Sequence, residues 1–234
     1  MIKAVGLSDW HRGRTDYPAS FADLIRRGED NGADLWVLPG DLSQGGTPKQ
    51  MRQVAADLSV TSLPKLAVWG NHDTYQRTRA EIAENAAILA DAGVTLLDYS
   101  GAVVTVRGIT VAVAGGIGFG GGWSSTVDAE NAAGAMRVAA WLAGCGAQVK
   151  LLMWHYAPAI GITIGEKAAP WKLGSWLLGE VADIAGADHV FCGHVHWGSP
   201  RAATPGGITV DNCAWALRQD YTDVQVPVRA LAAA

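Results

Sequence analysis

Residues 65–73, Lys-Leu-Ala-Val-Trp-Gly-Asn-His-Asp, join a short apolar run to three side chains that can ligate a metal or transfer a proton. The run has the length and apolar character of a buried strand, and Gly70 is a turn residue that ends it. In an open α/β sheet, ligands bind in the crevice beyond the strand ends. The stretch therefore predicts a strand that delivers Asn71, His72 and Asp73 to a binding crevice.

Four other apolar runs end in polar side chains of the same kind. These side chains are Asp9 and His11, Asp41 after Gly40, His155, and the pair His194 and His196 after Gly193. Five of the six histidines thus lie at strand ends, and only His189, expected to be a packed or surface residue, lies elsewhere. Alone, Asp9 or Asp41 also fits a turn, and His155 fits a core histidine. Their recurrence at strand ends indicates one shared site.

The first half of the chain alternates between strand and helix patterns. Apolar runs predict strands at residues 2–7, 35–38 and 65–69, and helical spacing predicts helices at residues 17–31, 48–59 and 77–92. This alternation is typical of parallel strands with helical crossovers, and it predicts an α/β fold. Short strand candidates without helices follow, and residues 103–111 predict two strands around a tight turn at Arg107-Gly108.

The second half has a looser pattern. Helices are predicted at residues 128–143 and 173–184, strands at 94–97, 149–154 and 188–192, and two closing strands at 208–212 and 214–217. Residues 115–122 contain six glycines but lack the ending of a nucleotide-binding P-loop, so we interpret them as a flexible or closely packed loop. The long segment 156–171 carries two prolines and is a candidate lid or substrate loop.

Composition limits the class of protein. The 234 residues fit a single domain, 1–234, which is long enough to bury a core without a disulfide or structural metal. The net charge is −4 and no basic run occurs, which disfavours a general nucleic-acid groove. The three cysteines are far apart and odd in number, which favours a reduced, cytoplasmic setting. No stretch has the length of a membrane span.

The candidate ligands favour two metal ions over one. Carboxylate, amide and imidazole groups suit Mn²⁺, Fe, Co²⁺ or Zn²⁺, and a catalytic zinc needs only about three protein ligands. The seven candidates are Asp9, His11, Asp41, Asn71, His155, His194 and His196. They fit two ions if one carboxylate bridges them, and in an extended chain His194 and His196 face the same way.

In this order, Asp-x-His, Gly-Asp, Gly-Asn-His-Asp, His and Gly-His-x-His resemble the motifs of the calcineurin-like metallophosphoesterase superfamily. The resemblance extends from residue 9 to residue 196. It implies an α/β fold of α+β type, a four-layer αββα sandwich of two mixed β-sheets flanked by helices. It also implies two divalent metal ions, with Mn²⁺ expected and Fe, Zn²⁺, Co²⁺ or Ni²⁺ as alternatives.

The resemblance further implies a role for each candidate residue. Asp9, His11 and His196 would hold one metal, and Asn71, His155 and His194 would hold the second. Asp41 would bridge the two ions. The catalytic residues would be His72, which assists the leaving group while a metal-bridging hydroxide attacks phosphorus in line, and Asp73, which orients His72.

The expected activity is hydrolysis of a small phosphodiester or phosphomonoester. Protein phosphatases of this superfamily carry Asp-Arg-Gly and Gly-Asn-His-Glu motifs, which this chain lacks, and His155 is followed by one proline instead of a pair. The alternatives are a nuclease of the same superfamily and a non-catalytic binding scaffold on this fold. The cations expected near a small substrate are Arg12, Arg14, Arg77 and Lys167.

Overall fold

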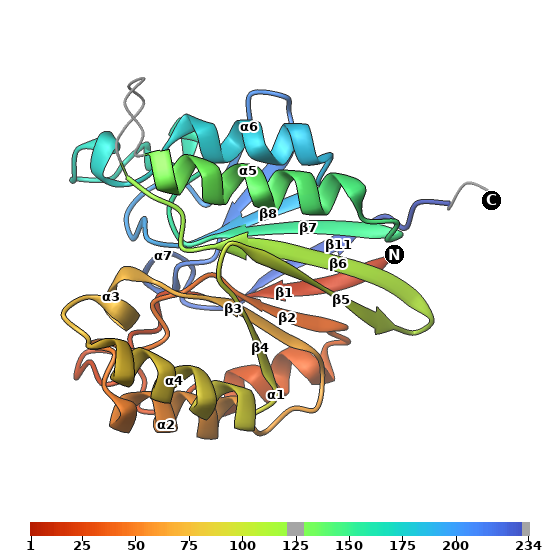
Figure 1. Ribbon diagram of the computed structural model, residues 1–234. Helices are drawn as coiled ribbons and strands as arrows, with labels where there is room; N and C mark the ends of the chain where they lie inside the picture. Colours follow the sequence, from red (N-terminus) through yellow and green to blue (C-terminus); the bar gives the residue numbers. More distant parts are fainter. Residues whose placement is uncertain (121–128, 231–234) are drawn as a thin grey trace.

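The computed structural model describes residues 1–120 and 129–230 of the chain. Within this part, two mixed β-sheets of five and six strands pack face to face, and helices cover their outer faces (Figure 1). The expected four-layer α/β sandwich is therefore confirmed. No helix of the described part is long and apolar enough to cross a membrane.

The five-stranded sheet has the order β11-β1-β2-β3-β4. Its strands are β1 (Ile2–Gly6), β2 (Leu35–Leu38), β3 (Lys65–Val68), β4 (Val94–Leu97) and β11 (Thr222–Val226). The first four run parallel, whereas β11 pairs antiparallel with β1. The helices of this side are α1 (Ala22–Asp30), α2 (Pro48–Leu58) and α4 (Arg79–Asp91). The loops that follow β1, β2 and β3 consequently leave the sheet at the same edge.

The six-stranded sheet has the order β5-β6-β7-β8-β10-β9. Its strands are β5 (Ser100–Val106), β6 (Ile109–Gly116), β7 (Val149–Trp154), β8 (His189–Cys192), β9 (Arg201–Ala203) and β10 (Thr209–Asn212). α5 (Ala129–Gly144) and α6 (Trp176–Ala185) cover its outer face (Figure 1). β5 and β6 form the expected hairpin, with φ of 49° at Arg107 and 77° at Gly108, as a two-residue type I′ turn requires.

Apolar side chains of both sheets form the core between them. Val37 and Val68 of the first sheet and Met153 and Phe191 of the second are fully buried in one cluster. This packing fixes one sheet against the other. Both chain termini lie at one end of the sandwich, and the one-turn helices α3 (Asn71–Thr74) and α7 (Trp215–Arg218) lie at the opposite end (Figure 1).

One predicted helix has the wrong start, and one predicted strand is wrong. The helix predicted at residues 17–31 begins only at Ala22, because the Ser20 hydroxyl donates to Asp57 and accepts from the Ala22 N–H, which holds the preceding residues in a loop. The closing strand predicted at 214–217 is instead the start of α7. Here the Trp215 N–H donates to the Ser8 carbonyl and turns the chain toward β1, so that the closing strand is β11.

The two loops singled out from the sequence have different outcomes. Residues 156–171 contain two short 3₁₀ turns, Ile160–Thr163 and Pro170–Lys172, and a bridge between Ala157 and Gly174 ties the segment to the body. In the stretch 115–122, the first two glycines end β6, and residues 121 and 122 lie outside the described residues. The helix predicted at 128–143 is α5, and residue 128 also lies outside that part.

Candidate metal centre

Five strands of the two sheets deliver polar side chains to one end of the sandwich. β1, β2 and β3 come from the first sheet, and β7 and β8 come from the second. The residues just beyond them are Asp9, His11, Asp41, Asn71, His72, His155, His194 and His196. The structure thus brings together every candidate metal ligand and the candidate catalytic histidine named from the sequence.

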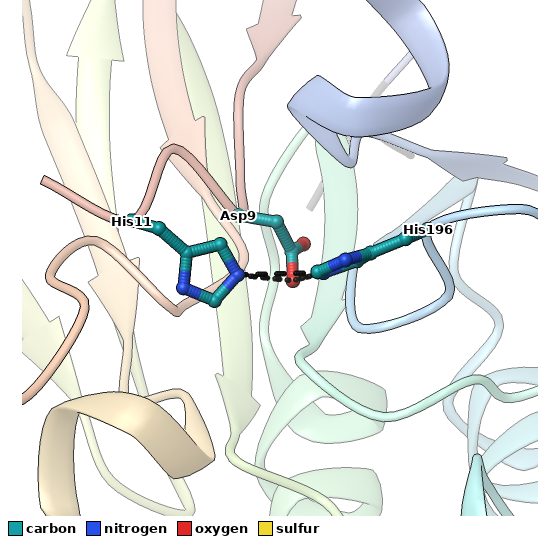
Figure 2. A group of neighbouring side chains, drawn as sticks. All are labelled: Asp9, His11 and His196. Atoms are coloured by element: carbon teal, nitrogen blue, oxygen red, sulfur yellow. Dashed lines mark hydrogen bonds and ion pairs between the residues drawn. The ribbon is translucent and has the colours of Figure 1, made fainter. Parts of the chain in front are cut away.

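The first group consists of Asp9, His11 and His196 (Figure 2). The Asp9 carboxylate lies 3.0 Å from Nε2 of His196, and the two Nε2 atoms of His11 and His196 are 3.4 Å apart. The Ser8 hydroxyl and the His194 N–H donate to the same carboxylate at 2.7 and 2.9 Å. These donors hold Asp9 in place while one oxygen faces the histidines.

The second group consists of Asn71, His155 and His194 together with Asp41. Nε2 of His155 lies 2.9 Å from Oδ1 of Asn71, and ligand atoms of Asp41, His155 and His194 all lie within 4.8 Å of one another. Nδ1 of His155 donates to the Pro39 carbonyl at 2.8 Å. That contact keeps Nε2 unprotonated in the neutral ring and turned toward the group, as outer partners of metal-ligating histidines do.

Asp41 lies between the two groups. Its Oδ2 is 3.8 Å from Nε2 of His11, and its Oδ1 is 3.5 Å from Nε2 of His155. One carboxylate therefore offers one oxygen to each group. The His72 N–H donates to Oδ1 at 2.8 Å and fixes this orientation.

The backbone at the site adopts an unusual conformation. Eight described residues other than glycine have a positive φ, and four of them belong to the site: Asp9 (53°), His11 (43°), Asp41 (50°) and His194 (68°). This left-handed region disfavours residues with a Cβ, and such strain concentrates at functional sites. The turns after β1, β2 and β8 thus accept a conformational cost that aims these side chains inward.

Two glycines of the motifs are explained by close approach. A Cβ on Gly70 would lie 2.1 Å from both the Asp41 N and its Oδ1. A Cβ on Gly193 would lie 2.3 Å from Oδ2 of Asp9. In both places a side chain would occupy the space of a candidate ligand, so only glycine lets the neighbouring strand ends converge.

Burial sets the charge of the site. It lowers the pKa of both His11 and His194 to about 3, so these imidazoles are neutral and have a free lone pair. Burial, together with the charges of Asp9 and Asp73, raises the pKa of Asp41 well above its ordinary value. Metal binding requires deprotonated ligands, and neutral imidazoles have the free lone pair that a metal ion needs. A divalent cation would also offset the repulsion between the buried carboxylates, so this set of side chains fits a divalent cation.

The environment of Asp73 differs from the sequence-based expectation. Its carboxylate accepts from the N–H groups of Leu42, Ser43 and Gly70, at 3.2, 2.9 and 3.0 Å, and from the Ser43 hydroxyl. Nδ1 of His72 instead lies 2.9 Å from the carbonyl oxygen of Gln44. Asp73 therefore ties the loop after β2 to the turn after β3, and the Gln44 carbonyl orients His72.

Sequence reasoning missed Gln44 because a backbone carbonyl has no residue-type signal. It also missed a cavity beside His196 that Arg14, Tyr17, Trp197 and Gln219 help to line. Three of the four cations named as substrate contacts are paired with carboxylates: Arg12 with Asp57, Arg14 with Asp16 and Arg77 with Glu81. The fourth, Lys167, lies over the Trp197 ring.

Comparisons with known proteins agree with this geometry. The sequence model of the calcineurin-like phosphoesterase family matches residues 2–198. A search of the curated proteins found no match.

Several solved structures share the fold. The phosphopantetheinyl hydrolase PptH from Mycobacterium tuberculosis superposes with a TM-score of 0.66 and 14% identity, over 95% of each chain. TT1561 of Thermus thermophilus superposes with a TM-score of 0.60 and 17% identity, over 97% of this chain and 99% of its own. GAP50, the anchor in the inner membrane complex of Plasmodium, superposes with a TM-score of 0.60 and 13% identity, over 92% of this chain and 72% of its own. The family match covers most of the chain and both halves of the centre, and the chain belongs to the calcineurin-like phosphoesterase family.

Proposed function

We propose that the protein is a dinuclear metal-dependent phosphoesterase that hydrolyses a small phosphodiester or phosphomonoester. The observation that carries the proposal is the position of Asp41, which offers one oxygen to each of two ligand groups. A carboxylate placed between two such groups is the arrangement that a pair of divalent ions requires.

The donor set of each group fits a divalent cation. Asp9, His11 and His196 would hold the first ion, Asn71, His155 and His194 the second, and Asp41 both. When bound, the two cations supply an activated water molecule and offset the negative charge of the phosphate. Mn²⁺ suits these oxygen and nitrogen ligands and is the ion we propose, with Fe, Zn²⁺, Co²⁺ and Ni²⁺ as alternatives.

His72 is proposed as the group that assists the leaving oxygen. Its ring lies 4.7 Å from the His11 ring, centroid to centroid, at the edge of the first group. Because Nδ1 donates to the Gln44 carbonyl, Nε2 is the nitrogen free to exchange a proton with an ester oxygen. The loop that carries Gln44 thus fixes which atom of His72 meets the substrate.

A small substrate is proposed because the site has little unpaired positive charge around it. Arg12, Arg14 and Arg77 are each paired with a carboxylate. A nucleic-acid backbone or a protein phosphosite would be held by unpaired Lys and Arg side chains. The phosphate itself would be held by the two metal ions and His72.

The test is hydrolysis of bis-p-nitrophenyl phosphate and p-nitrophenyl phosphate, with added Mn²⁺ and after chelation. Wild type is expected to turn over at least one ester only with metal. Asp41→Asn should reduce turnover to background, and His72→Ala should lower kcat by about 100-fold or more. Asp98→Asn, an exposed aspartate outside the site, is the matched control and should behave as wild type.

Metal content separates an enzyme from the scaffold alternative. Elemental analysis of wild type should give two ions per chain, and Asp41→Asn should give fewer. A chain that takes up less than one ion and cleaves neither ester would contradict the proposal and favour a scaffold. GAP50, which shares this fold, is described as the anchor in the inner membrane complex of Plasmodium.

A further inference from the structure

A cavity of about 290 Å³ opens directly beside the first ligand group. Its lining includes Arg14, Asp16, Tyr17, His196, Trp197 and Gln219. His196 belongs both to this lining and to the ligand group. A phosphate held at the centre would therefore have one of its substituents at the mouth of the cavity.

Arg14 and Asp16, which both line the cavity, form an ion pair with each other. Arg14 donates to both carboxylate oxygens of Asp16, with Nε 2.9 Å from Oδ1 and a terminal nitrogen 2.5 Å from Oδ2. The guanidinium also lies 4.5 Å from the Tyr17 ring centroid. A cation neutralised in this way does not recruit a second phosphate, so the cavity suits an uncharged substituent.

Flat aromatic surfaces form much of the wall. Trp197 is 60% exposed although it is a large apolar residue. Its backbone N–H donates to the Glu166 carboxylate at 3.0 Å. This bond holds the backbone of Trp197 next to His196. The Tyr17 ring lies edge-to-face on His11, at 5.9 Å. Exposed aromatic rings are stacking surfaces for planar groups.

Gln219 adds a hydrogen-bond acceptor to this wall. Its amide nitrogen donates to the carbonyls of Trp215 and Ala216, both at 3.2 Å. The amide oxygen is thus the atom that it can offer to a ligand. Its backbone is left-handed, with φ of 52°, at the end of α7. An acceptor beside aromatic surfaces suits a ring that bears an N–H donor.

We infer that this cavity binds a flat, uncharged heteroaromatic substituent of the phosphate ester, bearing an amino group, as an aminopurine does. The inference rests on the proposed function for the orientation of the phosphate. The ring would stack on Trp197, and its amino group would donate to the oxygen of Gln219. Trp197 and Gln219 are then specificity residues, which contact the substrate away from phosphorus.

Binding of adenosine to the metal-free protein, followed by ligand-observed NMR, tests the cavity without any turnover. Trp197→Ala should weaken adenosine about 10-fold, the scale of one base stacked on an aromatic ring, and Trp197→Phe should retain most of the affinity. Trp171→Ala is the matched control, because Trp171 is also 60% exposed but does not line the cavity. Equal affinity in Trp197→Ala and wild type, or no binding of adenosine, would overturn the inference.

Purine riboside, which has the same ring without the amino group, tests the role of Gln219. Wild type should bind adenosine several-fold more tightly than purine riboside, and Gln219→Leu should remove that difference. A difference that survives in Gln219→Leu would overturn the assignment of this residue.

Turnover separates this inference from the proposed function. With metal, Trp197→Ala should raise KM for adenosine 5′-monophosphate and leave KM for glycerol 1-phosphate unchanged. If neither of these esters nor either p-nitrophenyl ester is cleaved while adenosine binding still depends on Trp197, the proposed function fails and the cavity assignment stands. If both esters are cleaved and Trp197→Ala affects them equally, the cavity assignment fails alone.

Discussion

Asp211 is a fully buried carboxylate that connects several elements away from the metal centre. It accepts from His189 at 3.1 Å, from Arg201 at 2.9 Å and from Arg218 at 2.8 Å. Burial acts to raise its pKa, but the hydrogen bonds from His189 and Arg201 outweigh burial and hold the pKa of Asp211 below its ordinary value. His189, the histidine outside the strand-end pattern, is therefore a packed residue of this network.

Replacing Asp211 with Asn should lower the free energy of unfolding by about 2 kcal/mol at pH 7, because Arg218 loses its partner. A carboxylate whose pKa is depressed in the folded state stabilises the folded protein at pH values above the pKa that the group has in the unfolded chain. The difference in the free energy of unfolding between Asp211→Asn and wild type should thus have its full size above pH 3.8, the ordinary pKa of the carboxyl group, and should decrease as the pH falls below that value. Urea titrations at pH 7 and pH 3 measure this, and equal stability at pH 7 would contradict it.

At the metal centre, the sequence predicted which residues meet but not all of their contacts. His155 and His194 follow β7 and β8, which are parallel neighbours, so the proximity of these two histidines could be deduced from strand order. The proximity of Asn71 to them could not, because β3 belongs to the other sheet and the contact depends on how the two sheets pack. The contacts of Asp73 could not, since they depend on how the loop after β2 folds back. That loop places the N–H groups of Leu42 and Ser43 against the carboxylate.

Among the elements, long periodic helices and buried strands were predictable, and the short helix α7 was not. α2 matches its predicted range closely because its apolar spacing reflects burial on one face, and β7 does so because its continuous apolar run is buried on both faces. α7 is one turn long, so its four residues show no period, and an apolar run there was mistaken for a strand.

The start of α4 permits a local test. The Thr78 hydroxyl accepts from the Glu81 N–H at 3.2 Å, and the Glu81 carboxylate accepts from the Thr78 N–H at 2.9 Å, which forms a capping box. Thr78→Ala should lower the free energy of unfolding by about 1 kcal/mol, and Thr78→Ser should retain the cap. Thermal unfolding measures both variants. Identical melting of Thr78→Ala and wild type would show that the box does not stabilise α4.

For the whole molecule, metal binding should raise the free energy of unfolding and the melting temperature. Asp9, Asp41 and Asp73 are buried carboxylates, and a bound cation offsets their mutual repulsion. Each ion at about 100 times its Kd adds about 2.7 kcal/mol, which for a chain of this size raises Tm by about 5–10 °C per ion. Differential scanning fluorimetry with Mn²⁺ and with a chelator measures the shift. Asp41→Asn should lose most of it, and a wild type that melts equally in both would contradict metal binding to the folded state.

The division of the ligands between two sheets has a consequence for the order of folding. β1, β2 and β3 carry Asp9, Asp41 and Asn71, whereas β7 and β8 carry His155 and His194. Neither half of the chain alone holds a complete set for either ion. Tight metal binding therefore requires that the two sheets have already docked. The ions then stabilise the assembled sandwich and do not nucleate its folding.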